Sequence, residues 1–378
     1  MDTTTFHPFE MERMMSQFEK EVEFNLSESG VHPITLQSLI DNHDRALDEL
    51  LATEINYPHV NGIPELRDNI ALTYDGANRE NVFVTVGAIE ANYLVIRTLL
   101  NPDDEIVVMS PNYMQIWGIA KNHQLRVKTF DLIEENGWAP DLDELESKLS
   151  PKTKLVAVCN PNNPTGRILT ESEMDRIVDL TSRSGSWLLA DEVYRGAERL
   201  TDEISPSFYG KYDKVIAIGS MSKAYGLPGL RIGWAATEAQ EVLDEMWARH
   251  EYIAISATML SNKLAAIALR PETRTHLLGR TRNYIREGFP ILQQWMDDHP
   301  GVFSLAPPDA SAVAFIRYNL EINSSELTQR LVTEKSVLIV PGDHFGLDHH
   351  IRVSFGLPHD YLTSALDRIA GLIKDVGA

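Results

Sequence analysis

Lys223 is the residue with the clearest potential for covalent chemistry in this chain of 378 residues. It follows the apolar run from Val215 to Gly219 and lies among small hydroxyl residues. That run has the pattern of a buried strand, and open α/β sheets gather ligands at the carboxyl ends of their strands. An amine that is desolvated there loses its proton and attacks carbonyl groups. The sequence therefore predicts a lysine that forms a Schiff base.

Two further strand patterns end in polar side chains. Leu155–Val158 runs into Asn163 within Asn-Pro-Asn-Asn-Pro-Thr-Gly, and Trp187–Ala190 runs into Asp191 and Tyr194. Neighbouring strands lie about 4.8 Å apart, so an amide, a carboxylate, a phenol and an amine are expected to converge on one small molecule. Asp191 and Asn163 can also be read as ordinary turn or cap residues, because these residue types favour turns.

The combination matches the needs of pyridoxal phosphate. That cofactor requires a lysine, a carboxylate at its ring nitrogen, hydrogen bonds to its phenolate oxygen and a phosphate site. Asp191 would be the partner of the ring nitrogen, whose pKa its charge would raise. Asn163 and Tyr194 would donate hydrogen bonds to the phenolate oxygen.

A phosphate site is predicted where the first strand pattern, Val82–Val86, leads through Gly87 into a helical pattern. A glycine turn that opens a helix aims backbone N–H groups at an anion. A plain structural turn is the alternative. Side-chain donors that would complete the site are Ser220, Ser222 and Arg231.

Three more residues have both a functional and a structural interpretation. Tyr113 follows the strand pattern Ile106–Met109, so its ring would either stack on a cofactor or fill the core. Tyr57 precedes the sheet and can be read as a loop aromatic. Arg352 is a charge inside an apolar strand pattern, and it needs a carboxylate from the protein or from a substrate.

The elements that must position these residues form an α/β pattern. From Asn81 onward, strand patterns alternate with amphipathic stretches, which is typical of a mostly parallel sheet with helices on both faces. A helical pattern, Pro8 to Lys20, precedes the sheet as an arm. After about Arg280, a long helical pattern, three strand patterns and a terminal helix from about Asp360 predict a smaller α+β lobe. Its strand patterns are Val313–Arg317, Val337–Val340 and Ile351–Phe355.

Composition excludes several classes of function. The formal net charge of −21 opposes binding to nucleic acid, which depends on clustered Lys and Arg. No apolar run approaches the roughly 18 residues of a membrane span, and the N-terminal residues lack the pattern of a signal peptide. Cys159 is the only cysteine, so no intramolecular disulfide can form. We therefore expect a cytoplasmic protein without nucleic-acid or membrane partners.

Other chemistries have weaker support. His344, His349 and His350 could hold a metal, but no acidic or cysteine ligand pattern accompanies them, and no metal is expected. The glycines after Lys223 are spaced wrongly for a dinucleotide-binding loop. Cys159 lies in a buried-strand pattern and is expected to be a core residue.

In series, these segments resemble the class I/II aminotransferases of the fold-type-I pyridoxal-phosphate enzymes. The resemblance runs from Tyr57 to Arg352 and rests on Asn-Pro-Asn-Asn-Pro-Thr-Gly, Asp-Glu-Val-Tyr and Ser-x-Ser-Lys-x-x-Gly-Leu-Pro-Gly-Leu-Arg-Ile-Gly-Trp. It implies a mostly parallel seven-stranded sheet in a large domain, with a smaller α+β domain. The implied domains are an arm with part of the small domain at 1–45, the large cofactor-binding domain at 46–280, and the small C-terminal domain at 281–378.

The resemblance also implies a reaction and a role for each residue. An amino group would move between an L-amino acid and a 2-oxo acid through an aldimine of Lys223, which would also shuttle a proton. Arg352 would hold the substrate α-carboxylate, with Asn163 beside it, and the arm would pass over the substrate at Gly30. Tyr57 would reach the phosphate of the neighbouring subunit in a homodimer. The implied cofactor contacts are Asp191 at the ring nitrogen, Asn163 and Tyr194 at the phenolate, Tyr113 on the ring face, and Ala88, Ile89, Ser220, Ser222 and Arg231 at the phosphate.

Three segments look closer to the capreomycidine synthase group, whose members cyclise a hydroxylated arginine. They are the residues around Glu28 (27–32), those around Asp309 (308–315) and the segment 340–346. In that case Glu28 or Asp309 would pair with a cationic substrate side chain, although both can also be solvated loop carboxylates. Elimination or ring closure by a cyclase or lyase therefore stays open as the alternative to transamination.

Overall fold

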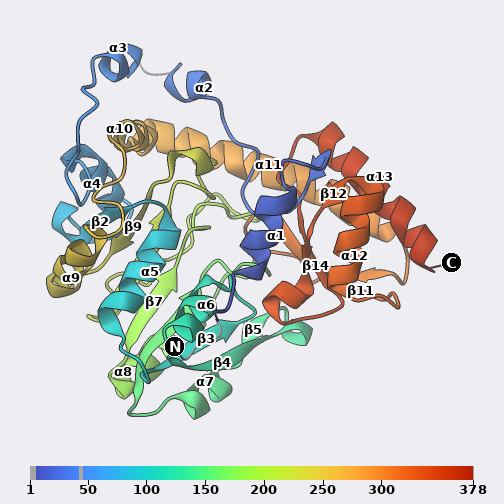
Figure 1. The fold of residues 1–378 in the computed structure, drawn as a ribbon, viewed down its shortest axis with the longest axis horizontal. Helices are drawn as coiled ribbons and strands as arrows, with labels where there is room; N and C mark the ends of the chain where they lie inside the picture. Colours follow the sequence, from blue (N-terminus) through green and yellow to red (C-terminus); the bar gives the residue numbers. More distant parts are fainter. Residues whose placement is uncertain (1–5, 42–45, 378) are drawn as a thin grey trace.

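The computed structural model describes residues 6–41 and 46–377, which form two sheets and a two-stranded pair, together with the helices around them (Figure 1). The helices are α1 (Glu10–Phe18), α2 (Leu36–Ile40), α3 (Ala46–Leu51), α4 (Pro64–Ala71), α5 (Ala88–Leu99), α6 (Gln115–Asn122), α7 (Leu142–Lys148), α8 (Glu171–Ser184), α9 (Gln240–His250), α10 (Met259–Ala268), α11 (Pro271–Asp297), α12 (Ser324–Arg330) and α13 (His359–Gly377). Short 3-10 or π turns are η1 (Arg79–Asn81), η2 (Glu134–Asn136), η3 (Pro228–Leu230), η4 (Leu331–Lys335) and η5 (Gly342–Phe345).

The large sheet contains all five strands expected from the sequence before residue 220. Its strands in spatial order are β2 (Val82–Thr85), β9 (Gly233–Ala236), β8 (Val215–Ser220), β7 (Trp187–Asp191), β6 (Thr153–Cys159), β3 (Glu105–Ser110), β4 (Arg126–Ile133) and β5 (Ala139–Pro140). The run from β8 to β4 is parallel, whereas β9 is antiparallel to both of its neighbours. The expected α/β class is confirmed, and the two-residue β5 adds an eighth strand at the edge.

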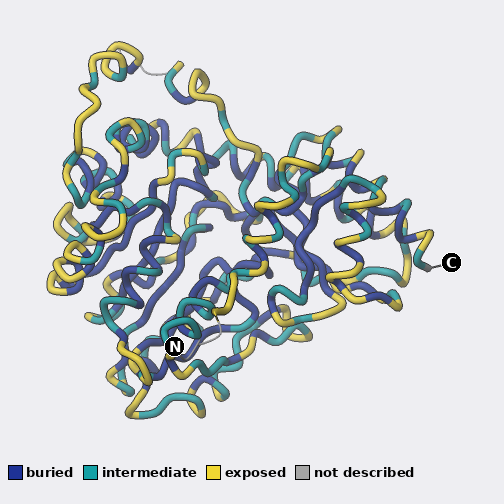
Figure 2. Tube along the Cα trace, in the orientation of Figure 1, coloured by how far each residue is buried: buried dark blue, intermediate teal, exposed yellow. Residues whose placement is uncertain are grey.

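Strands β2, β9, β8 and β7 of this sheet are buried along nearly their whole length because helices cover both faces. In β7, Leu188 and Ala190 pack with α7 and α8, whereas Leu189, which points the other way, packs with α5, α6 and α9. Figure 2 shows the strands as a buried layer beneath partly exposed helices. A sheet of this kind presents the residues that follow its parallel strands along one edge.

The smaller sheet is antiparallel and lies toward the C-terminus. Its order is β10 (Phe303–Ser304), β11 (Val313–Tyr318), β14 (His350–Ser354) and β13 (Val340–Pro341). The strand patterns at 313, 337 and 351 are confirmed, and the terminal helix begins at His359. The long helix begins at Pro271, earlier than the expected Arg280, because the pattern after Arg270 already suits a helix that starts with proline.

The beginning of the chain packs against its end. Strand β1 (Phe24–Asn25) pairs with β12 (Val337–Leu338), and α1 inserts Met11 and Met15 into a core shared with both sheets. The predicted boundary at residue 280 falls inside α11, and residue 45 lies outside the described residues. The division into domains stays a prediction.

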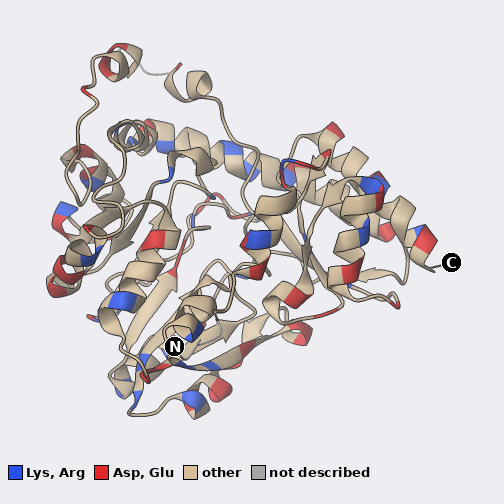
Figure 3. Cartoon of the chain, in the orientation of Figure 1, with Lys and Arg blue, Asp and Glu red and all other residues tan. Residues whose placement is uncertain are grey.

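Figure 1 also shows α2 and α3 projecting beyond the body of the molecule, near α10. Lys and Arg are interspersed with Asp and Glu along the described chain (Figure 3). Among residues 6–41 and 46–377, every helix is too short or too polar to cross a membrane.

Candidate active site

The carboxyl ends of β6, β7 and β8 open into a cavity of about 300 Å³. A cavity of this size is at the lower end of the range for small-molecule sites. All but two of the residues predicted for the site line it. These cavity-lining residues are Ala88, Ile89, Tyr113, Asn163, Asp191, Tyr194, Ser220, Ser222, Lys223, Arg231 and Arg352.

Lys223 follows β8 and reaches the cavity with its side chain only partly exposed. Among the described residues, its amine has no hydrogen-bond or ion-pair partner. Burial lowers the pKa of Lys223 below its usual value; Arg352 and Arg231 act in the same direction, whereas Glu28 and Glu12 oppose it. The amine is therefore easier to deprotonate than a surface lysine, as a nucleophile or proton carrier requires.

Asp191 is the last residue of β7 and is buried at the cavity wall. Burial raises the pKa of Asp191, while hydrogen bonds from Asn92 at 3.0 Å and from the backbone of Val193 at 3.3 Å lower it. Asn92 lies one helical turn after Ala88 in α5 and is itself in contact with Gln115 at 3.2 Å. The carboxylate is thus oriented by fixed donors while one side faces the cavity.

Tyr194 and Asn163 bring uncommitted hydrogen-bonding groups to the same place. The Tyr194 hydroxyl is buried and has no partner of full hydrogen-bond geometry among the described residues. Burial raises the pKa of Tyr194, whereas Arg352 and, after it, Ser29 lower that pKa. The amide oxygen of Asn163 accepts from Arg352 at 3.0 Å, which turns its NH₂ group away from the arginine. A buried hydroxyl without a partner is costly, and a ligand would satisfy it.

The other end of the cavity is built for an anion. Gly87 opens α5 at φ +77°, and a Cβ there would lie 2.5 Å from a guanidinium nitrogen of Arg231. Gly87 offers no side chain to cap the first N–H groups of α5, which include those of Ala88 and Ile89. Gly233 allows equally close contact, because its Cβ would lie 2.2 Å from the nitrogen of Ala88. A helix N-terminus, a guanidinium and two nearby serine residues are groups of the kind that bind phosphates.

Arg352 lies on β14 and is 2% exposed. Its guanidinium donates to Asn163 and to the carbonyl of Ser27, and its Nε has no hydrogen-bond partner among the described residues. No described carboxylate lies within ion-pair distance of it. Burial lowers the pKa of Arg352, but an arginine stays charged in proteins. The cavity therefore contains a buried cation whose counter-ion the described part of the chain does not supply.

The N-terminal helix closes one wall of the cavity. The hydroxyl of Tyr113 donates to Glu12 of α1 at 2.7 Å, and the ring of Phe9 meets that of Tyr113 edge to face at 5.1 Å. Burial, and after it Glu12, raises the pKa of Tyr113, which therefore stays a neutral donor. The contact fixes both the tyrosine ring and the position of α1.

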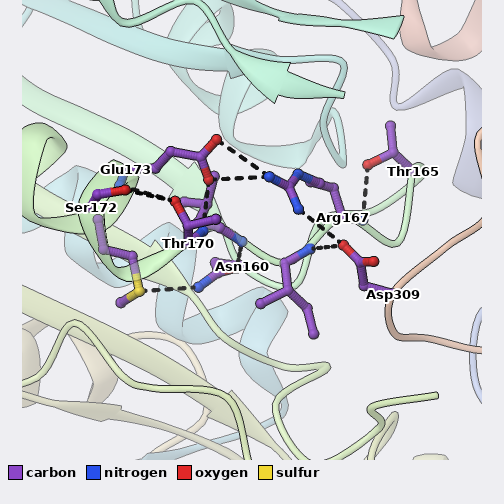
Figure 4. Close-up of polar contacts among 10 residues, drawn as sticks. Asn160, Thr165, Arg167, Thr170, Ser172, Glu173 and Asp309 are labelled. Carbon is purple, nitrogen blue, oxygen red and sulfur yellow. Dashed lines mark hydrogen bonds and ion pairs between the residues drawn. The ribbon is translucent and has the colours of Figure 1, made fainter. Parts of the chain in front are cut away.

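Three residues named from the sequence do not line the cavity. Tyr57 is 81% exposed and lies outside the cavity. Gly30 is adjacent to the lysine, since a Cβ there would lie 3.8 Å from the Lys223 side chain. Asp309 does not line the cavity; it binds Arg167 at 3.2 Å and the backbone of Ile168 at 3.1 Å (Figure 4). One carboxylate oxygen of Asp309 holds the loop after β6, and a contact between Asp309 and a substrate stays a prediction.

Asn92, Gln115 and Glu12 also line the cavity, although the sequence did not point to them. Asn92 could have been found, because an amide on the otherwise apolar inner face of a helix needs a buried partner. Glu12 gave no usable signal, since on an amphipathic helix it looks like any solvated glutamate. The histidines set aside as metal ligands lie apart from this site: His350 contacts Glu134 at 3.2 Å and stacks on Phe315.

Comparison with known proteins agrees with this geometry. The family Aminotransferase class I and II matches residues 25–369, and the chain belongs to that family. It is 31% identical to capreomycidine synthase of Streptomyces vinaceus, over 92% of this chain and 88% of that protein. It is 28% identical to arginine–pyruvate transaminase of Pseudomonas aeruginosa, over 86% and 84%. A PLP-dependent aminotransferase of Streptococcus suis superposes with a TM-score of 0.92 at 29% identity, covering 99% of each chain.

The protein is therefore a pyridoxal-phosphate-dependent aminotransferase, as the sequence predicted. Its own cavity fits the cofactor: Gly87 leaves room for the guanidinium of Arg231 beside the N-terminus of α5, an arrangement that suits a phosphate, and the buried Tyr194 hydroxyl offers a donor. Asn92 and the backbone of Val193 hold the Asp191 carboxylate at the cavity wall, a position that suits a partner for a ring nitrogen.

Proposed function

We propose that this aminotransferase binds the α-carboxylate of its substrates with Arg352 and uses Lys223 to move the α-proton. The observation that carries the proposal is the buried Arg352 without a carboxylate partner, in the same cavity as a lysine that is easily deprotonated. Burying an unpaired charge costs several kcal/mol, so this arrangement is expected only where a ligand completes the pair.

Bound pyridoxal phosphate supplies an electron sink that stabilises negative charge at the substrate Cα. The chain's residues do the rest. Asp191 holds the ring nitrogen in its charged form, Asn163 and Tyr194 donate to the phenolate oxygen, and Tyr113 covers the ring face. With the cofactor bound, the free amine of Lys223 would take the proton from Cα and would deliver it to the cofactor carbon, because a proton put back on Cα would transfer no amino group.

At the far end, the N–H groups of Ala88 and Ile89, the hydroxyls of Ser220 and Ser222 and the guanidinium of Arg231 would hold the phosphate. The α1 helix, tied to Tyr113 through Glu12, limits the access of water to the reacting atoms. Gly30 lets the chain pass close to Lys223, where a side chain would meet the carbonyl of Ser222 at 3.2 Å.

Reduction with borohydride tests the role of Lys223. Treatment of the holoenzyme, followed by digestion and mass mapping, is expected to find the cofactor mass on the peptide that contains Lys223. Lys223→Ala serves as the control and should give no label and no turnover. A label on another lysine in fully active wild-type enzyme would reject the assignment.

We further propose a homodimer in which Tyr57 of each chain contributes to the other active site. The support is the set of large apolar side chains exposed in and around the projecting segment of α2 and α3 and the neighbouring α9–α10 loop, more than a monomer usually leaves open. They include Leu51, Ile55, Tyr57, Tyr252, Ile253 and Ile255. Sedimentation of the holoenzyme should give the mass of two chains. Tyr57→Phe should weaken binding of the cofactor through its phosphate without changing that mass.

A cytoplasmic location is part of the same proposal. Cys159 is a buried free cysteine, and burial raises its pKa, so it is an inert thiol that suits a reducing compartment.

Ring closure or elimination is the second candidate, because the chain is 31% identical to capreomycidine synthase. The two reactions differ in the final form of the cofactor. Incubation with an amino donor alone should convert the cofactor to its amino form if the enzyme transfers the group. A cofactor that stays in the aldehyde form while substrate is consumed would favour the second candidate.

A further inference from the structure

Three glutamates line the cavity that contains Lys223 and Arg352. Glu12 and Glu19 come from α1, and Glu28 comes from the loop that leads to Gly30. The same cavity holds buried polar atoms without partners among the described residues, the Nε of Arg352 and the hydroxyl of Tyr194. The glutamates are thus part of a site with unfilled hydrogen-bonding capacity.

Glu12 and Glu28 have no basic partner within the described residues. One oxygen of Glu12 accepts the Tyr113 hydroxyl at 2.7 Å, which leaves its other oxygen free. No hydrogen bond or ion pair of the Glu28 carboxylate is present in the same residues. Glu19 differs, since it lies 3.6 Å from the neighbouring exposed Lys20. Two carboxylates therefore remain available at the cavity wall.

Both carboxylates also lie within electrostatic reach of the reacting groups. Glu28 and Glu12 each raise the pKa of Lys223 and of Arg352, against the effect of burial. A substrate whose α-carboxylate neutralises Arg352 and whose α-amine reacts near Lys223 would extend its side chain toward the remaining wall. That wall would then carry net negative charge.

We infer that Glu12 and Glu28 bind the cationic side chain of the amino-acid substrate, a guanidinium or an ammonium group. This inference rests on the proposed function, because it assumes that Arg352 holds the α-carboxylate. A planar guanidinium fits two carboxylates best, since its donors point in two directions in one plane. An acidic side chain at the same wall would be repelled. Asp309, which the sequence also offered for this role, is committed to Arg167 (Figure 4).

The test compares substrates of nearly the same shape and different charge. We expect the wild-type holoenzyme to show a kcat/KM for L-arginine roughly 10- to 100-fold above that for neutral L-citrulline, because hydrogen bonds between charged groups are worth that much. L-lysine should react better than L-norleucine, and L-glutamate should be the poorest substrate. In Glu12→Gln/Glu28→Gln the ratio of arginine to citrulline should fall to about 3-fold or less by the same reasoning.

Glu10→Gln is the matched control. It removes the same charge from the same helix, but Glu10 is exposed and lines a separate hollow beside α12. Its arginine-to-citrulline ratio should equal that of wild type. Because Glu28 makes no hydrogen bond among the described residues, Glu28→Gln alone should fold normally, and it should lower the ratio in the same direction.

A wild-type ratio near one would overturn the inference, and this outcome requires no variant. So would a double variant that keeps the wild-type ratio, or one that loses the rates with arginine and citrulline equally. If neutral or acidic amino acids react well and cationic ones do not, only this inference fails. If no amino acid of any charge reacts with the loaded enzyme, the proposed function fails as well.

Discussion

Arg282 and Arg352 are both buried guanidinium groups, but only Arg282 has a carboxylate partner in the described chain. Arg282 donates to Glu198 at 2.7 Å, and the other oxygen of Glu198 accepts from the backbones of Gly196 and Ser205 at 2.9 Å. Arg352 is buried more deeply, yet it contacts only an amide and a carbonyl. The completed pair joins α11 to the loop after β7, whereas the incomplete one lies in the cavity. A buried charge that the protein leaves open therefore marks the binding site.

The largest expected effect is on activity. Arg352→Gln should lower kcat/KM for the preferred amino acid roughly 30- to several thousand-fold. This loss corresponds to about 2–5 kcal/mol of transition-state stabilisation, because the variant removes one partner of a desolvated charge pair. Steady-state kinetics with saturating cofactor provide the measurement. A loss below about 5-fold would mean that another cation holds the carboxylate.

The completed pair should instead determine stability. Glu198→Ala would leave Arg282 buried without its carboxylate, and the free energy of unfolding should fall by about 3–5 kcal/mol. Urea denaturation of the apoenzyme measures it. Glu245→Ala, which breaks the exposed pair with Arg249 on α9, is the control and should change the same quantity by about 0.5 kcal/mol or less.

Removing the unpaired Arg352 should affect the free energy of unfolding in the opposite way. Arg352→Met removes a buried charge that has no counter-ion among the described residues, so the apoenzyme should keep its stability or gain up to about 2 kcal/mol. The same urea experiment applies. A loss as large as that of Glu198→Ala would show that Arg352 serves the scaffold, and the contrast between the two arginines would disappear.

The smallest effect is a pH dependence at Lys223. Its folded-state pKa lies below the usual lysine value of 10.5, so in the window between the two the unfolded chain binds more protons. The free energy of unfolding of the wild-type apoenzyme, relative to that of Lys223→Met, should therefore rise as pH increases through this window. The wild type should be least stable relative to the variant below the folded-state pKa of Lys223. Equal pH profiles of the two proteins would contradict the lowered pKa.

The sequence was sufficient for residues that directly follow apolar strands. Asn163, Asp191, Tyr194 and Lys223 reach the cavity because the period and length of their strands determine where each strand ends. The strand β4 was missed, since its exposed and half-buried residues, which include Lys128, do not form an apolar run.

Contacts between distant segments could not be predicted. Nothing in the spacing of residues places Glu12 of the N-terminal helix against Tyr113, or assigns Asp309 to Arg167, because both depend on how the smaller sheet packs on the larger one. The choice between Glu28 and Asp309 as cavity residues therefore required coordinates.

Substrates with and without a carboxylate test the central claim about Arg352 most directly. The measurement is the ratio of kcat/KM for the preferred L-amino acid to that for the amine that lacks only its carboxylate, in wild type and in Arg352→Gln. We predict that wild type prefers the amino acid by at least roughly 30-fold and that the variant loses this preference. An undiminished preference in Arg352→Gln would contradict the account, because the carboxylate would then be bound elsewhere.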